Sequence, residues 1–171
     1  MKINIYAELS SGPYGGGNQF LKALKKKFIN NGCYEDNYKL ADILIFNSHH
    51  SLKNVCEIKY KYPEKILIHR VDGPLFLARG KMGRITDKLI FYINHQIADA
   101  IVFQSDWSRK ESYKLGYIKN KFEKIIINAP DPEIFYPIKK NIPKKFGLIA
   151  SSWSNNQRKG FYFYHFLDDK L

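Results

Sequence analysis

The segment Ile43-Leu44-Ile45-Phe46 decides the fold, because four apolar residues follow one another without a polar break. A strand with one face in water alternates apolar and polar side chains, whereas a strand covered on both faces is apolar throughout. Ile125-Ile126-Ile127 repeats the pattern later in the chain. Both runs are typical of a parallel sheet with helices on each side, so the sequence predicts an α/β protein.

Short apolar runs alternate with longer amphipathic segments on either side of this segment, as they do in repeated βα units. In the first such segment, Leu21, Leu24 and Phe28 share one face of a helix. We therefore predict a doubly wound, Rossmann-like parallel sheet. The predicted strands are Ile3–Ala7, Ile43–Asn47, Ile66–Arg70, Ala100–Gln104, Ile125–Asn128 and Phe146–Ala150, and the predicted helices are Asn18–Asn31, Ser51–Tyr62, Ile85–Ala98 and Ser108–Leu115.

The chain has 171 residues, the length of one domain with part of a second. Its 44% hydrophobic and 15% aromatic content can form a sizeable core. The sequence has no apolar run near the roughly 20 residues that span a bilayer, and its first residues lack the features of a signal peptide. Because Cys33 and Cys56 are too few for a disulfide framework or a zinc knuckle, we expect a cytosolic protein.

The chain is strongly basic, with 28 Lys and Arg against 16 Asp and Glu and a formal net charge of +12. This balance is consistent with phosphorylated substrates or with peripheral contact to an anionic membrane, and equally with a solvated surface. The sequence has no helix-turn-helix, zinc-finger or aromatic RNA-binding pattern. Nucleic acid is therefore not an expected partner.

A proline-rich stretch, Asn128–Pro137, marks a domain boundary, because three prolines in eight residues exclude a helix or a central strand. A basic linker at 138–145 follows, and Phe146–Ala150 begins a new βα unit. A single βα unit cannot bury its own apolar face. We therefore expect a first domain at 1–137 and the start of a truncated second domain at 146–171.

Glycines cluster in the turn between the first strand and the first helix, at Gly15, Gly16 and Gly17. Backbone N–H groups at such a helix start can approach a phosphate or a sugar. Their spacing is not that of the dinucleotide-binding fingerprint, and a flexible turn explains the same residues.

Polar side chains follow the third predicted strand in His69-Arg70-Val71-Asp72-Gly73. The carboxyl ends of parallel strands are where open α/β sheets bind ligands. His69 or Asp72 could then act as a base or a hydroxyl partner, and Arg70 could bind an anion. The alternative is a strand-end salt bridge with no ligand.

Other strand ends carry further candidates. Ser105 and Ser108 are most simply helix caps. Arg158 and Lys159 follow the last predicted strand, where they could hold a diphosphate or be ordinary surface cations. The adjacent side chains of His49-His50 point apart, so a shared metal ion is not expected.

Taken in order, these segments resemble the amino-terminal half of a GT-B glycosyltransferase of the retaining family 4 type (glycosyl transferases group 1). The resemblance runs over nearly the whole chain, and its last two segments are the specific ones. The segments that carry it are Gly15-Gly16-Gly17, His69–Gly73, Ala98–Ser105, Ile126–Pro137 and Trp153–Phe161.

The resemblance implies two doubly wound domains that face each other across a cleft. The amino-terminal domain would hold the acceptor and the carboxyl-terminal domain the nucleotide-sugar, with no metal or other cofactor. The implied reaction is transfer of a sugar from a nucleotide-sugar to a glycan or lipid-linked acceptor, with retention of configuration.

The resemblance also assigns roles to single residues. His69 or Asp72 would act near the acceptor hydroxyl as catalytic residues, and Lys159 matches the family's phosphate-binding lysine. The family's arginine, five residues before that lysine, is Ser154 here, so Arg158 would take its place beside Lys159 on the donor diphosphate. The remaining substrate-binding candidates are Gly15, Gly16, Gly17, Arg70 and Ser105.

The family's pair of glutamates, with seven residues between them, does not occur in this chain. We therefore expect an acceptor domain and the first unit of a donor domain, which turns over poorly unless a carboxyl-terminal domain or a partner chain completes it. The second hypothesis is a non-catalytic glycan- or nucleotide-binding α/β module, or half of a two-chain assembly.

Overall fold

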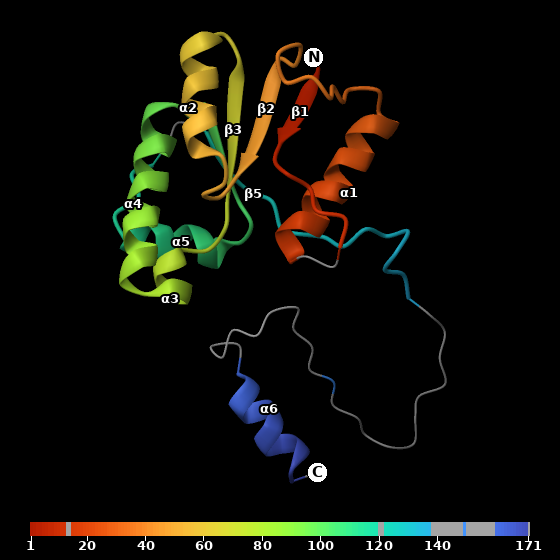
Figure 1. The fold of residues 1–171 in the computed structure, drawn as a ribbon, viewed down its shortest axis with the longest axis vertical. Coiled ribbons are helices and arrows are strands. Elements are labelled where there is room, and N and C mark those ends of the chain that lie inside the picture. Colours follow the sequence, from red (N-terminus) through yellow and green to blue (C-terminus); the bar gives the residue numbers. More distant parts are fainter. Residues whose placement is uncertain (13–14, 120–121, 138–148, 150–159, 171) are drawn as a thin grey trace.

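The computed structural model describes residues 1–12, 15–119, 122–137, 149 and 160–170. Five strands form one sheet in the order β1-β2-β3-β4-β5, and every neighbouring pair is parallel (Figure 1). The predicted α/β class with a parallel sheet is therefore confirmed. The strands are β1 (Ile3–Tyr6), β2 (Ile43–Asn47), β3 (Ile66–Val71), β4 (Ala100–Phe103) and β5 (Glu123–Ile125).

Helices follow each of the first four strands. They are α1 (Gly16–Asn30), α2 (Leu52–Lys61), α3 (Leu75–Arg79), α4 (Lys81–Gln96) and α5 (Asp106–Lys114), and α6 (Phe161–Asp168) lies near the end of the chain. No helix in the described part of the chain has the length and apolar character needed to cross a membrane.

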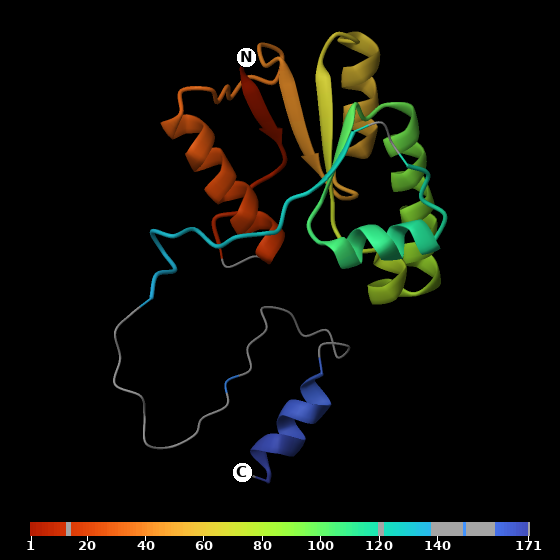
Figure 2. The ribbon, with the colours of Figure 1, turned by 180° about the vertical axis from the view of Figure 1, so that it is seen from behind.

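The sheet is doubly wound around β1. A parallel bridge joins Ile3 to Tyr34 on the edge of β1 that does not pair with β2: Ile3 donates to the Cys33 carbonyl at 2.8 Å and accepts from the Glu35 amide at 2.9 Å. The connection through α1 thus runs one way across the sheet, and those through α2 and α4 run the other way. Right-handed crossovers then place α1 on one face and α2 and α4 on the opposite face, as Figures 1 and 2 show.

The core lies mainly between the sheet and the helices α2 and α4. Leu44, Phe46, Leu67, Ile101 and Phe103 of the central strands are almost completely inaccessible. They pack with buried residues of the two helices, which are Leu52, Val55, Ile58, Ile90, Phe91 and Ile93. Leu44 and Phe46 of β2 lie in this core, whereas Ile43 and Ile45 on the other face of the strand are half-buried.

The strand predicted at Ile125–Asn128 begins and ends earlier in the structure. β5 spans Glu123–Ile125, whereas Ile126 and Ile127 lie beyond it and are 46% and 74% exposed. This strand forms the outer edge of the sheet, where helices do not cover both faces. The stretch Asn128–Pro137 contains neither helix nor strand, as its prolines predict.

The proline-rich stretch contacts α1. The Lys26 Nζ of α1 forms an ion pair with Glu133 and lies 3.7 Å from Asp131 Oδ2. Residues 138–145 and the predicted strand Phe146–Ala150 lie outside the described residues, apart from residue 149. The domain boundaries therefore stay a prediction.

The helical segment between β3 and β4 begins earlier than predicted and has a corner. A Cβ atom on Gly83 of α4 would lie 2.4 Å from backbone atoms of Leu75, so the two helices approach too closely for a side chain there. Buried Asp87 of α4 accepts hydrogen bonds from the Leu75 and Phe76 amides, both at 2.8 Å. It thus satisfies the first N–H groups of α3, a five-residue helix that the sequence analysis missed.

Candidate functional site at the sheet reversal

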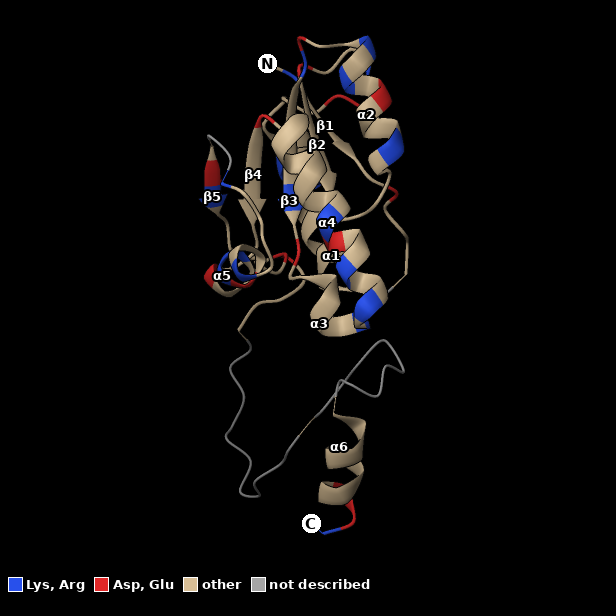
Figure 3. Cartoon of the chain, turned by 90° about the vertical axis from the view of Figure 1, so that its left-hand side faces the viewer, with Lys and Arg blue, Asp and Glu red and all other residues tan. Residues whose placement is uncertain are grey.

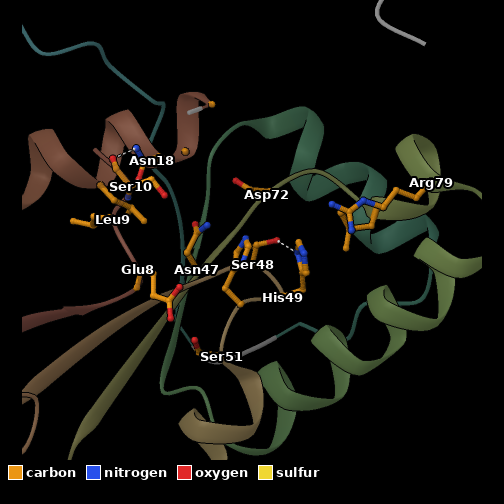
Figure 4. Close-up of a pocket in the computed structure, with 16 residues that line it drawn as sticks. Glu8, Leu9, Ser10, Asn18, Asn47, Ser48, His49, Ser51, Asp72 and Arg79 are labelled. Atoms are coloured by element: carbon orange, nitrogen blue, oxygen red, sulfur yellow. Dashed lines mark hydrogen bonds between the residues drawn. The ribbon is translucent and has the colours of Figure 1, made fainter. Parts of the chain in front are cut away.

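A pocket of about 580 Å³ lies at the carboxyl ends of β1, β2 and β3 (Figure 4). The chain reverses its direction across the sheet between β1 and β2, and open α/β sheets bind ligands in the crevice that such a reversal creates. The pocket is formed by the turn after β1 with the start of α1, the turn after β2, and the segment from β3 into α3. Its lining residues lie at 7–10, 15, 17–18, 21, 47–51, 72, 75 and 79.

The turn after β2 has a strained backbone. Ser48 and Ser51 have φ angles of 49° and 56°, in the left-handed region that residues other than glycine rarely adopt. Each such residue costs on the order of 1 kcal/mol, and strain of this kind gathers at ligand sites. The two serines bracket His49 and His50 at the wall of the pocket.

His49 is the titratable ring of this wall that the sequence analysis considered only as a metal ligand. Its Nδ1 lies 3.2 Å from Ser48 Oγ, and its ring centroid is 4.4 Å from that of His50. Burial lowers the pKa of His49, and the neighbouring His50 and Arg79 lower it further. A neutral imidazole in a pocket can exchange a proton or a hydrogen bond with a hydroxyl group.

Asp72 reaches the pocket from the end of β3. Its Oδ1 accepts from Arg70 Nη1 at 2.6 Å, and its carbonyl accepts from Ser108 Oγ at 2.9 Å. The side chain is 33% exposed, so a ligand can reach it. The predicted strand-end salt bridge is thus present, and its carboxylate lies at the site.

The Arg70 guanidinium is buried and does not line the pocket; it links several strand ends through hydrogen bonds. The residue is 2% exposed, and its guanidinium lies 5.0 Å from the centre of the Phe20 ring on α1. Its hydrogen bonds join the ends of neighbouring strands, because they reach side chains that follow or end β2, β3, β4 and β5. The acceptors are Asn47 Oδ1, Asp72 Oδ1 at 2.6 Å, Gln104 Oε1 at 3.2 Å and Asn128 Oδ1 at 2.9 Å.

His69 lies on the face of β3 opposite to that of Arg70, because successive side chains of a strand point to opposite sides. The ring is completely buried, stacks on Phe46 at 4.1 Å and contacts the Asn94 amide of α4 through Nδ1. Its Nε2 lies 2.7 Å from the Ser48 carbonyl. Burial lowers the pKa of His69 to about 4, so the ring is neutral and donates to that carbonyl. A ring enclosed in this way does not reach an acceptor hydroxyl, so the catalytic role expected for His69 does not fit its position.

The glycine turn lies where the sequence analysis placed it. Gly15 and Gly17 line the pocket, and α1 begins at Gly16 with no side-chain cap and no acidic residue in its first turn. Asn18 closes the turn onto the helix: its Oδ1 accepts from the Ser10 amide and its Nδ2 donates to the Ser10 carbonyl, both at 3.1 Å. Among the described residues, no side chain caps the first N–H groups of α1.

The other predicted site residues lie elsewhere. Ser105 caps α5 by accepting from the Ser108 amide at 3.0 Å, which starts this helix earlier than predicted, and it does not line the pocket. Arg158 and Lys159 lie outside the described residues, so their role stays a prediction. The described residues contain no group of three His, Cys, Asp or Glu side chains suited to a metal ion.

No family model and no curated protein sequence matches this chain. Among solved structures, it is similar to HepE from Anabaena, crystallised in complex with UDP-glucose, with a TM-score of 0.54 and 13% sequence identity. The similarity covers 75% of this chain and 44% of HepE, so the chain spans less than half of that protein. At this identity the likeness shows a shared fold.

Proposed function

We propose that this chain is the acceptor-side half of a GT-B glycosyltransferase of the family 4 type. The complete protein would transfer a sugar from a nucleotide-sugar to a hydroxyl of a glycan or a lipid-linked acceptor, with retention of configuration. The observation that carries the proposal is the pocket at the sheet reversal, in a fold shared with a protein that was crystallised with UDP-glucose.

Asp72 and His49 are the proposed partners of the acceptor hydroxyl. Both line the pocket from different turns, and Figure 4 shows them on neighbouring parts of its wall. Arg70 fixes the Asp72 carboxylate, which can then accept a hydrogen bond from the hydroxyl. Neutral His49 can take up the proton that this hydroxyl loses on transfer.

His69 has an indirect role in this proposal. Through Nε2 it holds the carbonyl of Ser48, the left-handed residue that precedes His49. His69 is therefore a positioning residue that keeps the turn after β2 in the shape that the pocket requires. Arg70 acts in the same way on Asp72 from the other face of β3.

The anionic part of the donor would approach the start of α1. Gly15 and Gly17 leave the first N–H groups of the helix accessible, and the helix dipole favours negative charge there. Arg158 and Lys159 are proposed to bind the diphosphate from the donor side. Basic residues of this kind would offset the charge of the departing nucleoside diphosphate.

The binding part of the proposal can be tested by titrating the ¹⁵N-labelled chain with UDP-glucose and with UDP alone, followed through its amide resonances. We expect shifts to concentrate at 15–18 and 47–51, and to weaken in Arg79→Gln, which changes an exposed residue of the pocket wall. Lys53→Gln, on the exposed face of α2, is the matched charge control. Shifts that lie only outside the pocket would contradict the proposal.

A transfer assay separates this proposal from the second hypothesis. If the chain binds nucleotide-sugars in the pocket but shows no transfer once a donor-side domain is supplied, it is a non-catalytic binding module.

A further inference from the structure

The solvent-facing side of α4 carries no acidic residue. We call this surface the α4 outer face. Asp87, the acidic residue of the helix, is turned inward as the cap of α3. The α4 outer face consists of Lys81, Met82, Arg84, Ile85, Lys88, Leu89, Tyr92, His95 and Gln96, all of which are exposed.

One half of the α4 outer face is apolar. Met82, Ile85, Leu89 and Tyr92 are 73%, 66%, 49% and 64% exposed, although residues of this type are usually buried. Their spacing of three, four and three residues places them in one row along the helix. Four large apolar side chains in one exposed row mark an interaction surface.

The other half of the α4 outer face is basic. Lys81, Arg84 and Lys88 are spaced by three and four residues beside the apolar row, and Figure 3 shows basic residues on α4 on the side turned to the viewer. None of the three takes part in an ion pair between described residues. On α1, by contrast, Lys25 and Lys26 are paired with carboxylates.

We propose that the α4 outer face is a docking surface for an anionic membrane. A helix with an apolar row beside a basic row lies in the plane of a bilayer surface, with its apolar side chains at the acyl boundary and its cations at the headgroups. Charge decides between this occupant and a second copy of the chain. Two copies joined through this face would bring six unpaired cations together in a protein of net charge +12.

Helix α3 connects the docking surface to the pocket. It contributes Leu75 and Arg79 to the pocket wall, and the ring of its Phe76 lies 5.7 Å from the Arg84 guanidinium of the α4 outer face. A lipid-linked acceptor held in the membrane could therefore reach the pocket over a short path. This last step rests on the proposed function, whereas membrane docking itself does not.

The test is sedimentation of the chain with sucrose-loaded vesicles, without any nucleotide-sugar. Vesicles of phosphatidylcholine with phosphatidylglycerol should bind the chain, and vesicles of phosphatidylcholine alone should not. Lys81→Gln, Arg84→Gln and Lys88→Gln together should weaken binding roughly 100-fold, since each cation near an anionic surface contributes about five-fold. Ile85→Gln with Leu89→Gln should weaken it about ten-fold at unchanged net charge.

The matched control removes the same charge elsewhere, through Lys27→Gln, Lys53→Gln and Lys61→Gln at exposed positions of α1 and α2. It should change binding only a few-fold, and circular dichroism checks that every variant is folded. Absence of binding to the mixed vesicles overturns the proposal, as does an equal loss in the control. Self-association that disappears in Ile85→Gln with Leu89→Gln, without vesicle binding, would identify a second copy as the occupant.

Discussion

Replacing Arg70 with methionine should destabilise the fold more than any exposed arginine does. The substitution keeps a long side chain but removes the guanidinium that links the ends of β2, β3 and β4 and the segment after β5. The buried amide oxygen of Asn47 would lose its charged donor, and Asp72 its ion-pair partner. Both losses leave polar groups less well satisfied than in water.

The size of the effect follows from these contacts. Breaking a buried ion pair by removing one partner typically costs about 3–5 kcal/mol, and hydrogen bonds from a charged group contribute about 1.5–3 kcal/mol. Because Asp72 is 33% exposed, water screens part of the pair and the lower end applies. We expect Arg70→Met to lower the free energy of unfolding by about 3 kcal/mol, a large part of the roughly 5–15 kcal/mol of a domain.

Urea denaturation followed by circular dichroism measures this difference. Arg84→Met is the matched control: this arginine is exposed on α4 and contacts the Phe76 ring at 5.7 Å, so its loss should cost under about 1 kcal/mol. Equal free energies of unfolding for the two variants would refute the stabilising role of Arg70 as the residue that links the strand ends.

Three further predictions concern the scaffold around the pocket. Gly83→Ala should lower the free energy of unfolding by at least about 2 kcal/mol in thermal denaturation, because the added Cβ would lie 2.4 Å from the Leu75 backbone. Gly16→Ala is the control: its Cβ would have no atom within 4 Å, so this variant should be neutral or slightly stabilising. Asp87→Ala should cost about 1–2 kcal/mol in the same assay, since two amides of α3 lose their acceptor. The pKa of His69 is about 4 in the folded chain, below the ordinary 6.5, so the free energy of unfolding should fall by up to about 3 kcal/mol as the pH drops from 6.5 to 4. Urea denaturation at pH 6.5 and at pH 4 measures this fall, which should be smaller in His69→Gln.

The sequence predicted the strands best in the interior of the sheet. The bounds of β2 were predicted without error, because this strand has a neighbour on each side and helices cover both faces of the sheet, so that Leu44 and Phe46 are buried and Ile43 and Ile45 half-buried. The same reasoning misplaced β5, since Ile126 and Ile127 are apolar residues at an exposed edge. A run of isoleucines indicates only that the segment favours a strand. Whether both faces of that strand are buried depends on the elements that pack against it, which the run itself does not reveal.

Helix α3 could not be found from local pattern. Its five residues are too few for a periodic signal, and its cap, Asp87, comes from the next helix, twelve residues after Leu75. The following helix begins at Lys81 and not at the predicted Ile85, and its first turn contains Gly83, which makes a close contact with the Leu75 backbone.

The sequence indicated the sheet edge where the pocket lies, but not most of the residues that line it. Polar residues at the end of β3 pointed to this edge, and Asp72 lines the pocket. His69 and Arg70 have the same residue types as ligand-binding groups, but alternation along the strand turns them inward, onto α4 and α1. The turn around Ser48 was missed because serine carries no signal for a left-handed backbone.

Sugar transfer is the most direct test of the central claim. The chain is supplied with a donor-side domain shown to bind its nucleotide-sugar, and transfer of labelled sugar to glycan and lipid-linked acceptors is measured. The account predicts transfer that Asp72→Asn and His49→Gln each reduce strongly and that Lys53→Gln leaves unchanged. Absence of transfer across a broad panel of nucleotide-sugars, or transfer that both pocket variants leave intact, would contradict it.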